Sequence, residues 1–150
     1  MSIINISLSM HVIFGLVGII ASYAVFMGLL KRNLFLSFLR ISSITAFLGY
    51  ILSWFSGGYY YVLYYGDNVK PIIKAGDYPW AHSFFMETKE HIFLFLPVLS
   101  LVLAIIIYMF GDQLDRNQSL KNKTAMLAGA ITILATLITL SGVVISGSAR

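Results

Sequence analysis

Two of the three histidines of this chain and both of its glutamates lie in one stretch, residues 79–95, PWAHSFFMETKEHIFLF. These residues are His82, Glu87, Glu90 and His91. The remaining histidine, His11, lies near the start of another apolar segment. Imidazole and carboxylate groups ligate haem iron and metal ions. An ionisable residue inside an apolar segment is a functional candidate, because its burial in lipid is costly.

The segments that carry these residues are apolar enough to lie in a bilayer. Hydrophobic residues make up 59% of the chain and charged residues 11%, less than half of the roughly 25% that is typical of soluble domains. A domain of this size buries only about 70% of its unfolded surface, so lipid must cover the remaining apolar side chains. The sequence therefore predicts an integral membrane protein, which we place in a prokaryotic cytoplasmic membrane.

Four apolar segments predict an all-α, integral membrane, four-helix up-down bundle that forms a single domain. Each segment is long enough to cross a hydrocarbon core of about 30 Å. The expected spans are residues 6–30, 41–61, 87–110 and 124–146, with an outer loop at 62–86. The third helix is expected to begin near Pro79, to extend beyond the outer surface and to kink at Pro97.

Lysine and arginine residues predict the orientation, because they are enriched in cytoplasmic loops. Six lie on one side of the predicted bundle and four on the other, which places both termini outside. The first group is Lys31, Arg32, Arg40, Arg116, Lys121 and Lys123, and the second is Lys70, Lys74, Lys89 and Arg150.

His11 and His91 are the residues best suited to hold a cofactor. The first and third helices of an up-down bundle run in the same direction, so both imidazoles are expected at a similar depth near the outer face. That arrangement suits the two axial ligands of a b-type haem. Gly15, Gly18 and Ser22 follow His11 on the same helix face and would leave room for the macrocycle.

Two other interpretations of these residues stay open. Glu87 and His91 share a helix face, with Glu90 beside them, and together with His11 or His82 they could ligate a single copper or iron ion. Alternatively, the faces of small residues only pack helices together, in a structural subunit without a cofactor. His82 is nine residues from His91 and points away from it on a straight helix, which favours a surface position.

Basic and aromatic residues of the outer region could contact a bound cofactor. Lys70, Lys74 and Lys89 could hold haem propionates or form a solvated basic loop. The tyrosines between residues 59 and 65 could border a quinone site or form an aromatic belt at the membrane surface.

Several classes of function are not supported by the sequence. The chain has no cysteine, which excludes iron–sulfur clusters, disulfides and c-type haem attachment of its own. No phosphate-binding loop, dinucleotide fingerprint or nucleophile with a base is evident, so a stand-alone catalyst is not expected. The net charge of +4 is scattered and indicates no nucleic-acid partner.

Two stretches resemble a known family. The sequence MHVIFGLVGIIASY in the first span is similar to the first helix of small membrane proteins of the copper-resistance-D type and of the membrane protoporphyrinogen oxidase. The stretch WAHSFFMETKEHIFLFLPVL resembles their third helix. The resemblance implies a four-helix haem-binding or copper-related membrane protein, with His11 as a ligand and Lys89 nearby.

Together these patterns predict a membrane electron carrier. One b-type haem near the outer face, held by His11 and His91, would pass electrons between a quinone or membrane partner and an external redox protein. Little of the chain lies outside the lipid, which favours a subunit that works with other membrane subunits in a respiratory assembly.

Overall fold

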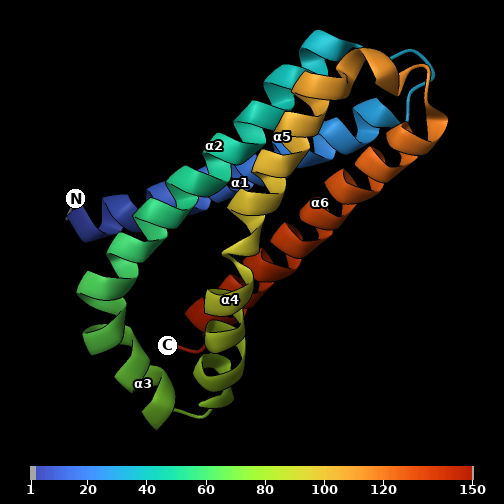
Figure 1. The fold of residues 1–150 in the computed structure, drawn as a ribbon. Helices are drawn as coiled ribbons and strands as arrows, with labels where there is room; N and C mark the ends of the chain where they lie inside the picture. The colour runs from blue at the N-terminus through green and yellow to red at the C-terminus, as the bar shows by residue number, and fades with distance from the viewer. Residues whose placement is uncertain (1–2, 150) are drawn as a thin grey trace.

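A computed structural model describes residues 3–149 of the chain. All regular secondary structure in this range is helical, and four helices are long and apolar enough to cross a membrane (Figure 1). These helices are Ile3–Leu29, Leu36–Ala75, Ala81–Leu114 and Gln118–Gly147. The predicted all-α architecture with four helices of membrane-spanning length is therefore confirmed.

The second and third of these long helices are composite. The elements in chain order are α1 (Ile3–Leu29), α2 (Leu36–Tyr60), η1 (Tyr61–Val69), α3 (Lys70–Ala75), η2 (Ala81–Met86), α4 (Glu87–Ile92), α5 (Phe95–Leu114) and α6 (Gln118–Gly147). The two η elements are π-helical, and such wider turns rotate the side chains that follow them relative to a continuous α-helix.

The first two helices pack closely because glycine lets their backbones meet. A Cβ on Gly49 of α2 would lie only 2.9 Å from the backbone nitrogen of Gly18 on α1. Beside this contact, Ser22 Oγ and the Tyr50 hydroxyl are hydrogen-bonded at 2.9 Å. In lipid, close backbone packing and interhelical hydrogen bonds of this kind hold helices together.

The second long helix extends further than the sequence predicts. An outer loop is expected at residues 62–86, whereas only residues 76–79 lie outside a helix. Gly66 has no positive φ, and Pro71 lies in the first turn of α3, where its missing N–H is not needed for a helical hydrogen bond. Neither residue breaks the helix, so the predicted loop is wrong.

The third long helix begins close to Pro79, as predicted, and is interrupted once. Residues 93–94 form a turn between α4 and α5. Pro97 lacks an N–H, and its ring clashes with the carbonyl group four residues earlier, which belongs to Phe93. The interruption lies three to four residues before Pro97, and the kink predicted there stays a prediction. At about 1.5 Å per residue, the 34 residues of Ala81–Leu114 extend beyond a hydrocarbon core of about 30 Å.

The larger of two hydrophobic clusters among the described residues lies in one half of the bundle. This core includes Leu29, Leu39, Leu103, Ile107 and Ile131. The opposite half contains the start of α1 and the end of α6, and we call it the His11 end. Figure 1 shows the η1–α3 and α4 segments at this end on either side of an open space between the ribbons.

Candidate functional site

His11 is held on α1 by a specific contact with α2. Its Nδ1 atom lies 2.8 Å from the backbone carbonyl oxygen of Ser53 and 3.0 Å from Ser53 Oγ. A carbonyl oxygen can only accept, so Nδ1 donates, and a neutral imidazole then carries its lone pair on Nε2. Ser53 Oγ donates in turn to the His11 carbonyl oxygen at 2.9 Å. Metal-ligating histidines are commonly oriented in this way through their other ring nitrogen.

Two glycines make room for His11 and for a lysine on the third long helix. A Cβ on Gly57 of α2 would overlap the His11 imidazole. A Cβ on Gly142 of α6 would lie 3.3 Å from Lys89 Nζ. A Cβ on the neighbouring Gly58, by contrast, would meet nothing within 4 Å. His11 and Lys89 are therefore each packed against bare helix backbone.

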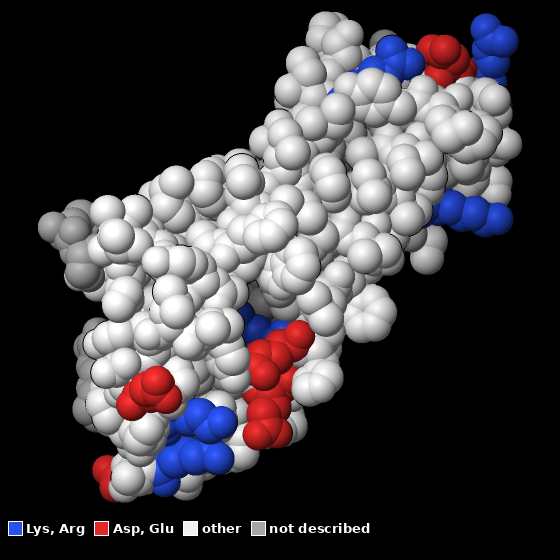
Figure 2. Space-filling view, turned by 60° about the vertical axis from the view of Figure 1, so that its left-hand side comes forward, with Lys and Arg blue, Asp and Glu red and all other residues white. Residues whose placement is uncertain are grey.

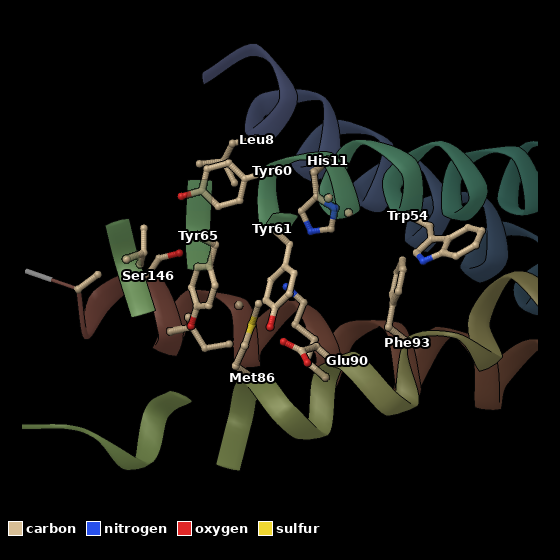
Figure 3. A pocket seen from close by; sticks show the side chains of 17 residues that line it. Leu8, His11, Trp54, Tyr60, Tyr61, Tyr65, Met86, Glu90, Phe93 and Ser146 are labelled. Carbon is tan, nitrogen blue, oxygen red and sulfur yellow. The ribbon is translucent and has the colours of Figure 1, made fainter. Parts of the chain in front are cut away.

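His11 and Lys89 line a common cavity of about 420 Å³ at the His11 end. Its walls include the aromatic side chains of Trp54, Tyr61 and Phe93 (Figure 3). An adjoining cavity of about 530 Å³ shares His11, Lys89 and Phe93 and continues along the bundle. Volumes in this range, with apolar walls and a few polar groups, are typical of cofactor and small-molecule sites.

Lys89 and Glu90 bring opposite charges to the smaller cavity. Lys89 is partly buried, and within residues 3–149 no hydrogen bond is formed by its ammonium group, although Glu90 acts on it electrostatically. Figure 2 shows a hollow on this face with acidic atoms at its rim and basic atoms set deeper. The ammonium group is therefore free to pair with an acidic group of a bound molecule.

The predicted pairing of His11 with His91 is not found. His91 is exposed, and its Nδ1 lies 2.7 Å from the carbonyl oxygen of Glu87 on its own helix. Lys89 and Phe93 are four residues apart and share a helix face, whereas His91 lies about 200° around the helix from Lys89. The rotation that turns Lys89 into the cavity thus turns His91 out of it. Glu87 is also exposed.

His82 is buried, which corrects the predicted surface position. Its exposed fraction is 2%, and its Nδ1 lies 3.0 Å from the hydroxyl of Tyr65, which is also buried. Tyr61 stacks on Tyr65 with 5.3 Å between ring centroids. The hydrogen bond between Tyr65 and His82 joins η1 to η2. Both segments are π-helical, so a projection based on one straight α-helix places His82 wrongly.

The two glycines predicted to leave room for a cofactor have different roles. Gly15 lines the larger cavity next to Ser53. Gly18 is buried against Tyr50, because a Cβ there would lie 2.7 Å from Tyr50 Cε1. Gly18 therefore serves the contact between α1 and α2, and its assignment to the cofactor site is corrected.

The alternative ligands for a single metal ion are dispersed. Within the described residues, no group of three or more His, Cys, Asp or Glu side chains is arranged to hold an ion. His11 and Glu90 line the cavity, whereas Glu87 and His91 are exposed.

The sequence prediction did not assign a role to several residues that shape this site. Ser53 and Gly57 are four residues apart on α2, and this spacing predicts that they share a face. Their contact with His11 depends on how α1 and α2 pack against each other, which spacing within one helix does not reveal. Phe93 likewise lines the cavity, four residues after Lys89 on the same helix face.

Searches of protein-family models, curated proteins and solved structures found no match to this chain. The resemblance to the copper-resistance-D and protoporphyrinogen oxidase proteins therefore stays a prediction. Function is inferred from the geometry and chemistry of the cavity, because a fold alone does not imply an activity.

Proposed function

We propose that the cavity at the His11 end binds a b-type haem, with His11 Nε2 as an axial ligand to the iron. The observation that carries this proposal is the contact of His11 with Ser53. Nδ1 is held 2.8 Å from a carbonyl oxygen, so the lone pair lies on Nε2, and the ring borders a cavity of about 420 Å³. Proximal histidine is a common ligand of b-type haem.

The other cavity residues suit a flat, amphipathic molecule with acidic groups. Trp54, Tyr61 and Phe93 provide aromatic surface against which a macrocycle would pack. The Lys89 ammonium group would pair with a propionate. Gly57 and Gly142 keep His11 and Lys89 close to the helix backbones, which leaves the space between them open.

Bound haem would supply one-electron redox chemistry, while the chain supplies ligation, orientation and exclusion of water. We therefore propose a membrane electron-transfer protein, as the sequence predicts. His91 is no longer proposed as a ligand of the haem iron. Its partners would be a quinone or membrane subunit on one side and an external redox protein on the other. We also propose, as the sequence analysis does, that it works in a prokaryotic cytoplasmic membrane as part of a respiratory assembly.

The first experiment is a dithionite-reduced minus air-oxidised spectrum of the detergent-purified protein after addition of haem. Wild-type protein is expected to show sharp α and Soret difference bands. His11→Ala should lose them or shift them strongly, because the iron loses its anchored ligand. His91→Ala is the matched control and should keep the wild-type bands, because that side chain is exposed.

Two results would contradict the proposal. Absence of haem bands in the wild type would exclude a haem site, and elemental analysis of the same sample would then separate a metal-binding protein from a cofactor-free structural subunit. Equal loss of the bands in the His11 and His91 variants would show that the ligand assignment is wrong.

A further inference from the structure

With His91 outside the cavity, any second axial ligand must come from another residue that lines it. Side chains with oxygen, nitrogen or sulfur atoms enter from η1, η2 and α4, across from His11 on α1. They are Tyr61, Tyr65, Met86, Lys89 and Glu90. Their other contacts show which of them is available to the iron.

Four of these five side chains have another role. The Tyr65 hydroxyl is hydrogen-bonded to His82 Nδ1 at 3.0 Å. The Tyr61 hydroxyl is directed towards the carboxylate of Glu90 (Figure 3), and the two groups interact electrostatically. Lys89 carries an ammonium group that packs against Gly142, and an ammonium group has no lone pair to donate to a metal.

Among the described residues Met86 makes no hydrogen bond, and its side chain packs against the apolar cluster that includes Tyr65 and Ile145. It is the last residue of η2, and Figure 3 shows its side chain reaching from that segment into the cavity, which His11 enters from α1. Met86, Glu90 and Phe93 lie at positions i, i+4 and i+7, so one face of this helix presents all three to the cavity. A thioether is a soft, weakly hydrogen-bonding group and a known partner of histidine on haem iron.

Resting on the haem site proposed above, we propose that Met86 is the second axial ligand, on the side of the haem opposite His11. Histidine–methionine ligation raises the reduction potential of haem relative to other axial pairs. The carrier would therefore accept electrons from a quinol-type donor and pass them to a partner of still higher potential. A closed sixth position would also prevent the reduced iron from binding external gases.

The test uses haem-loaded wild-type protein and the variants Met86→Leu, Met86→His and Met10→Leu. Met10 is the matched control, because its side chain is exposed and next to His11 in the sequence. Wild type and Met10→Leu are expected to be six-coordinate and low-spin, with little response to carbon monoxide after reduction. Met86→Leu should become high-spin and bind carbon monoxide rapidly. Met86→His should return to low-spin at a lower midpoint potential.

Several outcomes would overturn the ligand assignment while leaving the haem site in place. One is a Met86→Leu variant with the wild-type spin state and carbon monoxide response, and another is a wild-type protein that is already high-spin. Loss of haem from Met86→Leu supports the assignment only if Met86→His restores a low-spin haem, and otherwise counts against it. A wild-type protein that binds no haem overturns the proposed function itself.

Discussion

His11 on α1 and Ser53 on α2 are joined by a reciprocal pair of hydrogen bonds. His11 Nδ1 lies 2.8 Å from the Ser53 carbonyl oxygen, and Ser53 Oγ donates to the His11 carbonyl oxygen at 2.9 Å. The contact ties two helices of membrane-spanning length together and orients the imidazole at the same time. If His11 holds the proposed haem, stability and haem binding are expected to be coupled at this point of the bundle.

Replacement of Ser53 by alanine tests that coupling. Ser53→Ala removes the hydroxyl and keeps the backbone carbonyl group, so His11 is held less firmly. Loss of a group that orients a metal ligand typically weakens binding by 10–100-fold, and we expect a weakening of roughly tenfold in a haem titration. Ser43→Ala is the control, because Ser43 is also buried on α2 but its Oγ donates to the Arg40 carbonyl oxygen of its own helix at 2.9 Å. Equal effects of the two changes would argue against a role in orienting His11.

The two adjacent glycines of α2 are expected to respond differently to alanine. A Cβ on Gly57 would overlap the His11 imidazole, whereas one on Gly58 would meet nothing within 4 Å. Gly57→Ala should displace the ring, lower the free energy of unfolding by about 1–3 kcal/mol and abolish haem binding. Gly58→Ala places its methyl group in open space at the edge of the same cavity, so it should leave His11 in place, retain haem binding and be neutral or stabilising by up to about 1 kcal/mol. Thermal unfolding in detergent and a haem titration measure both effects.

Removal of the Tyr65 hydroxyl should destabilise the contact between η1 and η2 at the His11 end. Tyr65→Phe leaves His82 Nδ1 buried without its partner, which costs about 1–3 kcal/mol. Tyr64→Phe is the matched control, because Tyr64 is less buried and contacts the ring of Tyr60 at 5.6 Å between centroids. A double-mutant cycle of Tyr65→Phe with His82→Leu measures the interaction itself. Additive effects in that cycle would show that the hydrogen bond contributes nothing.

The charge of Lys89 is expected to decide how tightly an acidic cofactor binds. Lys89→Met keeps most of the aliphatic volume and removes the ammonium group. A hydrogen bond to a charged group contributes about 1.5–3 kcal/mol, so haem affinity should fall roughly 10–100-fold. Lys74→Met is the control, because Lys74 is exposed in the last turn of α3. Titration with haem and with its dimethyl ester separates the effect of the Lys89 charge from other effects of the substitution. The ester has no propionate charge, so it should bind wild-type protein and Lys89→Met equally.

The length of the apolar segments was enough to predict the main features of the fold. Four apolar stretches correspond to four helices of membrane-spanning length, and Pro97 is preceded by a break at residues 93–94. The loop prediction failed at Gly66 and Pro71, because a helix accepts glycine at negative φ and proline in a first turn. The tendency of Gly66 and Pro71 to end a helix is weak compared with the stability that η1 gains by packing against η2.

The sequence by itself determined that this chain is helical and apolar enough to span a membrane four times, and that His11 is an ionisable group within the first span. Only the tertiary structure decided which groups meet His11. Helical spacing places Lys89 and His91 on different faces, but the rotation of α4 decides which face lines the cavity. That rotation depends on the π-helical turns and on contacts with α6, including Lys89 against Gly142. These contacts join residues distant in the chain, so no periodicity within one segment can predict them.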